Sequence, residues 1–163
     1  MFRRRHPELA DVTAVILAED DPSAAEIRAA ELALLRRIAS EAVIVQDDAE
    51  QLLRQIRARE PLAVLAPVGG RLTSRFVALA RALPASADPE VQRYSARLRE
   101  VLDHHALMLS ASLDLLAVAW RSERLQDELD RISGLGRPAG WLEDIRMALV
   151  LESIPSTEAA LPS

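Results

Sequence analysis

The sequence contains no cysteine, and all 20 of its basic residues are arginine, so lysine is absent as well. Without cysteine there can be no disulfide framework, no thiolate nucleophile and no cysteine-ligated zinc or iron–sulfur site. Without lysine the chain can form no Schiff base and has no P-loop lysine for binding phosphate. Asparagine is also missing, and we attribute this bias to the codon usage of a GC-rich, bacterial-type genome.

Aromatic residues are scarce, at 3% of the chain, and the net charge is −5. Nucleic-acid binding requires a basic surface and commonly aromatic stacking platforms, so we expect no nucleic-acid partner. The one basic cluster, residues 3–5, is followed by His6, Pro7 and Glu8, and the apolar run at 14–18 is too short for an export signal. We therefore expect a cytoplasmic protein with no membrane span and no cofactor.

What the sequence does contain indicates a globular helical protein. Half of its 163 residues are hydrophobic and 28% are charged, which is typical of a chain that buries a single core. No internal repeat and no low-complexity tract divides it. We expect one helical-bundle domain over residues 1–154 and a flexible C-terminal tail over residues 155–163.

The first long amphipathic segment covers residues 23–59. Ser23 and Glu26 form a capping box, the signature of a helix N-terminus. A strand-like run at residues 42–45 leaves open whether the segment is one helix or two, but apolar spacing without glycine or proline favours one. The apolar stripe consists of Ile27, Ala30, Leu34, Ile38, Ala42, Val45, Ala49, Leu52 and Ile56.

The second long segment covers residues 89–133, between the helix-start signal Asp88-Pro89 and the helix-stop signal at Gly134. One continuous helix of this length would span about 67 Å, whereas a small domain is about 30 Å across. The helix must therefore bend or break, or else project and be covered by another chain. Residues 106–120 contain few polar side chains, so we expect them to be buried on more than one side, partly by a second copy.

A short helix is predicted ahead of the first long segment. Pro7 is suited to a first helical turn, and Leu9, Val12 and Ile16 are spaced to share one face over residues 7–19. The acidic residues 19–21 and the proline that follows them then end the helix.

Two further helices are predicted at residues 71–83 and 139–152, with a loop at residues 67–70 because proline and glycine interrupt helices. The predicted fold is an all-α bundle. It is built on two long antiparallel helices, about 23–59 and 89–133, with shorter flanking helices.

One cluster of polar residues suggests chemistry. Glu100 and His104 lie four apart, on one helix face, and could exchange a proton or hold a metal. A carboxylate-bridged di-iron bundle needs two Glu-x-x-His pairs, which the three histidines do not provide. His105 falls in the apolar stripe, as a core histidine would. We assign no catalytic or metal-binding residue, and keep Arg99, Glu100 and His104 as catalytic candidates and Glu100 and His104 as metal candidates.

The six residues from Arg99 to His104, which include these candidates, resemble the Arg-x4-His motif of the HEPN helical ribonucleases. The resemblance implies an RNA-cleaving helical enzyme in which Arg99 and His104 contribute to cleavage. Cleavage of RNA by the wild type, and its loss in a His104→Ala variant, would test this implication.

The lack of catalytic groups and the excess helix length favour a non-enzymatic protein-interaction module: a homo-oligomer, an adaptor or a partner-binding subunit. We expect its partner to be a second copy or a helical protein. The alternative is a small helical enzyme or metal-binding protein centred on Glu100, His104 and His105. The expected interaction surface consists of Leu109, Leu113, Leu116, Trp120, Leu125 and Leu129.

Overall fold

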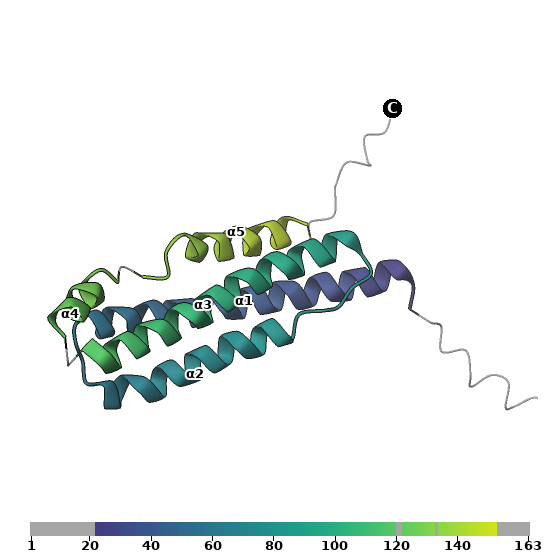
Figure 1. Cartoon of the computed structure of the whole chain (residues 1–163). Coiled ribbons are helices and arrows are strands. Elements are labelled where there is room, and N and C mark those ends of the chain that lie inside the picture. Colours follow the sequence, from purple (N-terminus) through teal and green to yellow (C-terminus); the bar gives the residue numbers. More distant parts are fainter. Residues whose placement is uncertain (1–21, 120–121, 133, 153–163) are drawn as a thin grey trace, which may run out of the picture.

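The computed structural model describes residues 22–119, 122–132 and 134–152, and confirms an all-α bundle (Figure 1). The predicted helix at residues 7–19 and the tail at residues 155–163 lie outside these ranges. Within them the helices are α1 (Ala24–Arg57), α2 (Leu62–Arg81), α3 (Pro89–Ala119), α4 (Glu123–Asp130) and α5 (Arg137–Leu151).

The three long helices lie side by side, and α5 packs against α1 and α3 (Figure 1). The two longest, α1 and α3, run in the same direction and not antiparallel as predicted. Arg28 near the start of α1 pairs with Glu90 near the start of α3, and Gln46 contacts His105 further along both helices. The physical reason is α2, which is long enough to return the chain between them as a full member of the bundle.

The first long segment is one continuous helix of 34 residues. At its start the Ser23 backbone N–H donates to Glu26 Oε2 at 2.8 Å, and the Glu26 backbone N–H donates to Ser23 Oγ at 3.3 Å. At its end Arg59 adopts a left-handed φ of 61°. The Arg59 guanidinium donates to both carboxylate oxygens of Asp130, at 3.0 and 3.2 Å, and so ties the end of α1 to α4.

The loop predicted at residues 67–70 is wrong, because these residues form the middle of α2. Pro67 is exposed there, so the carbonyl group that loses its helical N–H partner can be solvated. Gly69 is buried at a crossing of helices: a Cβ atom at this position would lie 2.4 Å from Leu113 Cδ1 and 3.2 Å from Leu52 Cδ2. The glycine therefore permits close packing and does not make a turn.

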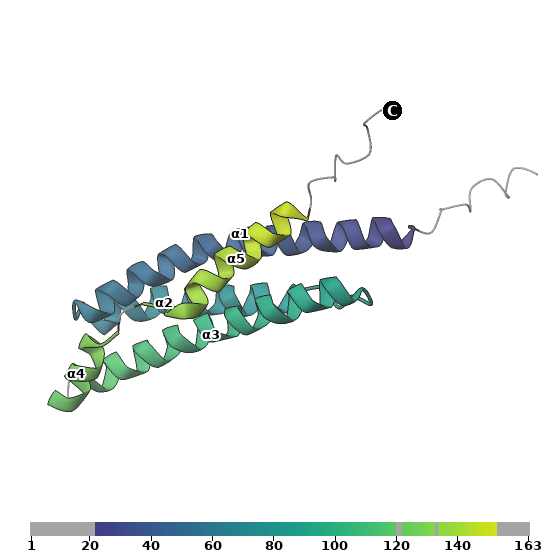
Figure 2. The same ribbon diagram turned by 90° about the horizontal axis from the view of Figure 1, so that it is seen from above.

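The second long segment, predicted at residues 89–133, is divided into α3 and α4, so of the expected alternatives it is the break that occurs. α3 begins as expected, with Asp88 Oδ1 accepting from the backbone N–H groups of Glu90 at 2.9 Å and Val91 at 3.1 Å. It ends at Ala119, and the separate helix α4 folds back across the end of the bundle (Figure 2). The break lets Leu129 reach the core, where it is fully buried. A straight helix would have carried Leu129 beyond the end of α1.

Two core helices, α2 and residues 89–118 of α3, are long and apolar enough to cross a membrane by length and composition. Central helices of a packed bundle pass the same test, so this finding carries little weight. Both helices bury part of their apolar surface against each other and against α1. The absence of a membrane span and the cytoplasmic location stay predictions.

Candidate interaction groove

The polar residues that form the predicted cluster on the second long segment differ in their exposure to solvent. Arg99, Glu100 and Asp103 are exposed on α3, His104 is half-buried, and His105 is fully buried. Within the described part of the chain, no hydrogen bond or ion pair joins Glu100 to His104, and no three His, Asp or Glu side chains are placed to hold a metal ion. The described residues therefore do not bring Glu100 into contact with His104, and Arg99, Glu100 and His104 stay untested candidates.

His105 is a core residue held by two polar contacts. Its Nδ1 lies 2.7 Å from the Val101 carbonyl oxygen and its Nε2 lies 3.0 Å from the Gln46 side-chain amide. Burial lowers the pKa of His105 from 6.5 to about 4, with a smaller contribution from His104, while the bond to Val101 opposes the shift. The ring is therefore neutral at pH 7.

A neutral His105 ring has one donor and one acceptor nitrogen. Because only a donor can bind the Val101 carbonyl oxygen, Nδ1 carries the proton and Nε2 accepts. Gln46 Oε1 lies 3.0 Å from Nε2, and because an oxygen cannot donate to an acceptor nitrogen, the neutral ring requires the Gln46 amide to be flipped so that its NH₂ group donates instead. The aromatic ring of Phe76, centred 5.2 Å from the imidazole, completes the packing between α1, α2 and α3.

The predicted interaction surface lies largely inside the bundle. Leu109, Leu116 and Leu129 are buried, and Leu113 and Leu125 are half-buried against the core. Trp120 lies outside the described residues. Helical periodicity identifies apolar faces, but it cannot tell whether the same chain or another one covers them. These leucines close the bundle itself.

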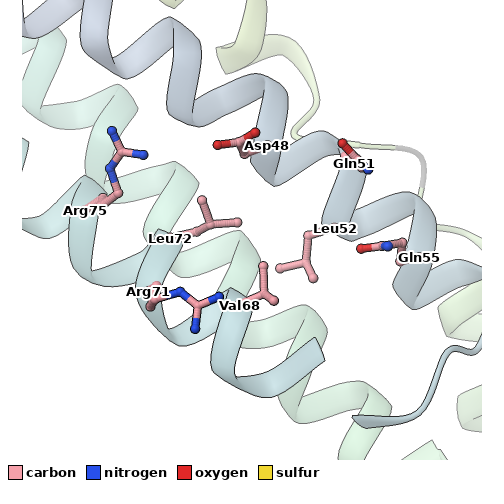
Figure 3. A pocket seen from close by; sticks show the side chains of 8 residues that line it. All are labelled: Asp48, Gln51, Leu52, Gln55, Val68, Arg71, Leu72 and Arg75. Carbon is pink, nitrogen blue, oxygen red and sulfur yellow. The ribbon is translucent and has the colours of Figure 1, made fainter. Parts of the chain in front are cut away.

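An open groove lies elsewhere, between α1 and α2 (Figure 3). Its volume is about 490 Å³, and Leu52 and Leu72 form its apolar floor with the half-buried Val68. The groove exists because α2 packs much more extensively against α3 than against α1. The full lining is Asp48, Gln51, Leu52 and Gln55 from α1, and Val68, Arg71, Leu72 and Arg75 from α2.

The two rims of this groove carry opposite charges. Arg75 on α2 pairs across it with Glu41 on α1 at 3.4 Å. Asp48 on α1 and Arg71 on α2 form no hydrogen bond or ion pair with any residue that the structure describes. The groove thus presents one unpaired carboxylate and one unpaired guanidinium to solvent.

Two exposed apolar side chains lie next to the groove, one on α1 and one on α2. Ile44 lies one helical turn before Asp48 and is 61% exposed, and Val64 lies one turn before Val68 and is 58% exposed. Spacing of four residues places each pair on one helix face. We call the surface made by the groove lining together with Ile44 and Val64 the α1–α2 face.

Sequence analysis missed the α1–α2 face because residues 67–70 were interpreted as a loop. A signal was present, since Val64, Val68, Arg71 and Arg75 follow each other at steps of three and four. Treating Pro67 as a helix breaker cut this row in two.

The chain matches no protein-family model, and comparison with curated proteins and with solved structures finds no significant relative.

Proposed function

We propose that this protein is a non-enzymatic interaction module that associates with a second copy of itself through the α1–α2 face. The observation that carries the proposal is the groove of about 490 Å³ between the two helices, with buried Leu52 and Leu72 and half-buried Val68 at its base and the exposed side chains of Ile44 and Val64 beside it. Large aliphatic side chains gathered in a groove with a polar rim are typical of surfaces that bind protein.

The rim charges favour a second copy as the occupant. Asp48 and Arg71 line the same groove from opposite helices, so they lie at about the same level along it (Figure 3). A two-fold axis running along the groove would set α1 of each copy against α2 of the other, in antiparallel orientation. Asp48 of each copy would then meet Arg71 of the other. The two unpaired charges would be satisfied twice, once on each side of the axis.

Sedimentation velocity over a range of protein concentrations tests this proposal. We expect a concentration-dependent dimer for the wild type and a monomer for the double variant Ile44→Arg/Val64→Glu, because a guanidinium at position 44 would be set against Arg75 of the other copy and a carboxylate at position 64 would be desolvated without a partner. The matched control is Leu107→Glu, which changes an aliphatic side chain that is 65% exposed on α3. This control should remain a dimer.

Three results would overturn the proposal. They are a wild type that stays monomeric at every concentration, a dimer that survives the double variant, and a dimer lost equally in the Leu107→Glu control. Circular dichroism of each variant, with an unchanged helical spectrum, keeps a folding defect from being mistaken for lost association.

A further inference from the structure

Most polar side chains that line the groove between α1 and α2 have no partner within the described chain. Arg75 is paired, with Glu41 at 3.4 Å. The other polar side chains of the lining form no hydrogen bond or ion pair with any residue that the structure describes: Asp48, Gln51, Gln55 and Arg71. These groups are therefore available to a molecule from solution.

The two free charges of the groove have opposite signs and stand on opposite rims. Asp48 belongs to α1 and Arg71 to α2, and the side chain of Leu72 lies between them in Figure 3. They are too far apart for a direct ion pair, which needs an N–O distance within about 4 Å. An anion attracted by Arg71 would be repelled by Asp48, and a cation would meet the reverse. The charges therefore favour a ligand that carries an ammonium and a carboxylate together.

The size and the base of the groove indicate what joins these two charges. Its volume of about 490 Å³ falls within the range of about 300–1,000 Å³ typical of small-molecule sites. Half-buried Val68 offers an aliphatic contact at the base. The side-chain amide of Gln51, about one turn along α1 from Asp48, can both donate and accept a hydrogen bond, as a peptide group requires.

A dipeptide with aliphatic side chains combines all of these features. Its free ends carry the two charges, and in an extended form they stand at most about 7 Å apart, which is enough to bridge two groups that cannot pair directly. Its peptide group matches the amide on the rim, and its side chains match the apolar base.

We propose that this groove binds an aliphatic dipeptide, with its ammonium paired to Asp48 and its carboxylate to Arg71, and that the dipeptide controls self-association. The control rests on the proposed function, because the dimer would use the same two charges, whereas the binding does not. A bound dipeptide leaves neither charge for the other copy, so it shifts the equilibrium toward the monomer by mass action.

Titration of the full-length protein with leucyl-leucine, followed by NMR chemical shifts, tests the binding. We expect saturable binding that weakens several-fold when the amino end is acetylated or the carboxyl end is amidated. Glycyl-glycine, which has no side chains, should bind several-fold more weakly as well.

Variants of the protein show whether each charge has the assigned partner. Asp48→Asn should weaken leucyl-leucine several-fold but leave the affinity for the acetylated dipeptide unchanged, because that ligand has no ammonium to lose. Arg71→Gln should behave in the same way toward the amidated dipeptide. The matched control is Asp47→Asn, which removes a carboxylate that points about 100° away around α1 and should change neither affinity.

Absence of saturable binding would overturn the proposal. An Asp48→Asn variant that weakens the acetylated dipeptide as much as the free one would do the same, since the ammonium would then have no special partner.

Sedimentation velocity with and without leucyl-leucine separates this proposal from the proposed function. We expect the dimer fraction of the wild type to fall as the dipeptide is added. A dimer that is unchanged at saturating dipeptide would overturn the control and leave the association standing. A wild type that binds the dipeptide but is monomeric at every concentration would overturn the proposed function and the control, and would support the binding site alone.

Discussion

The two sides of α2 differ sharply in how they are packed. On the side facing α3, Gly69 lets Leu113 approach closely, and Phe76 packs against His105 without any exposed surface. On the side facing α1, Arg71 and Arg75 stand at the rim of a groove of about 490 Å³ that is open to solvent. We call the first side the closed seam and the second the open side.

Under the proposed association, one helix would serve stability through the closed seam and recognition through the open side. A glycine at the crossing removes the side chain that would hold two helices apart, so dispersion contacts are complete on the closed seam. Two arginines and the amides of Gln51 and Gln55 line the open side, so the rim of the groove is polar. Substitutions on the closed seam should therefore change folding, and those on the open side should change association.

The largest effect is expected for Phe76→Ala, which removes an aromatic ring from the closed seam. Phe76 is fully buried, and removal of its ring should lower the free energy of unfolding by about 3–5 kcal/mol. Urea denaturation of this variant should be compared with Ile44→Ala on the open side, which should change stability by no more than about 0.5 kcal/mol. Similar losses for the two variants would contradict the distinction between the sides.

A pH dependence should also arise at the closed seam. The pKa of His105 is lowered from 6.5 to about 4, so the unfolded state binds a proton that the folded state does not. Its contribution to stability is therefore complete above pH 6.5 and is lost as the pH falls toward 4, by about 3 kcal/mol in all.

Urea denaturation at several pH values measures this loss. Replacement His105→Gln should flatten the dependence between pH 6.5 and 4, whereas His104→Gln should leave most of it, because burial lowers the pKa of His105 more than His104 does. A wild type and His105→Gln variant with parallel pH profiles would show that the imidazole titrates freely.

Substitutions at the neighbouring residues Gly69 and Gly70 allow the effect of close packing on stability to be measured apart from the effect of helix propensity. A side chain at Gly69 meets Leu113, whereas a side chain at Gly70 has no heavy atom within 4 Å. We expect Gly69→Val to destabilise the protein by about 1–3 kcal/mol through overpacking. Gly70→Val should be neutral or slightly stabilising, since valine is a better helix former than glycine. Thermal unfolding of the two variants gives the comparison, and equal melting temperatures would remove the role assigned to Gly69.

The smallest effect should come from the ion pair across the open side. Arg75 and Glu41 are each about half exposed, at 46% and 48% of the side chain, and surface pairs of this kind contribute about 0–1 kcal/mol. Glu41→Gln should therefore reduce the free energy of unfolding by less than about 1 kcal/mol in a urea titration, with a smaller difference at high salt. A larger loss would mean that the open side also holds the bundle together.

Local signals in the sequence predicted much of the fold. The capping box at Ser23 and the N-cap at Asp88 mark helix starts because their side chains bind backbone groups a few residues away. These contacts need no tertiary partner, so the sequence alone reveals them. The apolar stripe of α1 was identified for the same reason.

The remaining features depend on contacts between distant residues. Gly69 is tolerated within a helix because Leu113 packs over it, and α4 is separate from α3 in an arrangement that buries Leu129 in the core. The direction of α3 relative to α1 follows from the length of α2, which the loop predicted at residues 67–70 concealed. The α1–α2 face was missed for the same reason, and the leucines expected to bind a partner are those that close the bundle.

Charge reversal across the α1–α2 face tests the proposed association most directly. Asp48→Arg would set an arginine against Arg71 of the other copy, so this variant should be monomeric in sedimentation velocity at concentrations where the wild type is a dimer. Adding Arg71→Asp to the same chain restores opposite charges and should restore the dimer. A double variant that associates no better than Asp48→Arg alone would contradict the account.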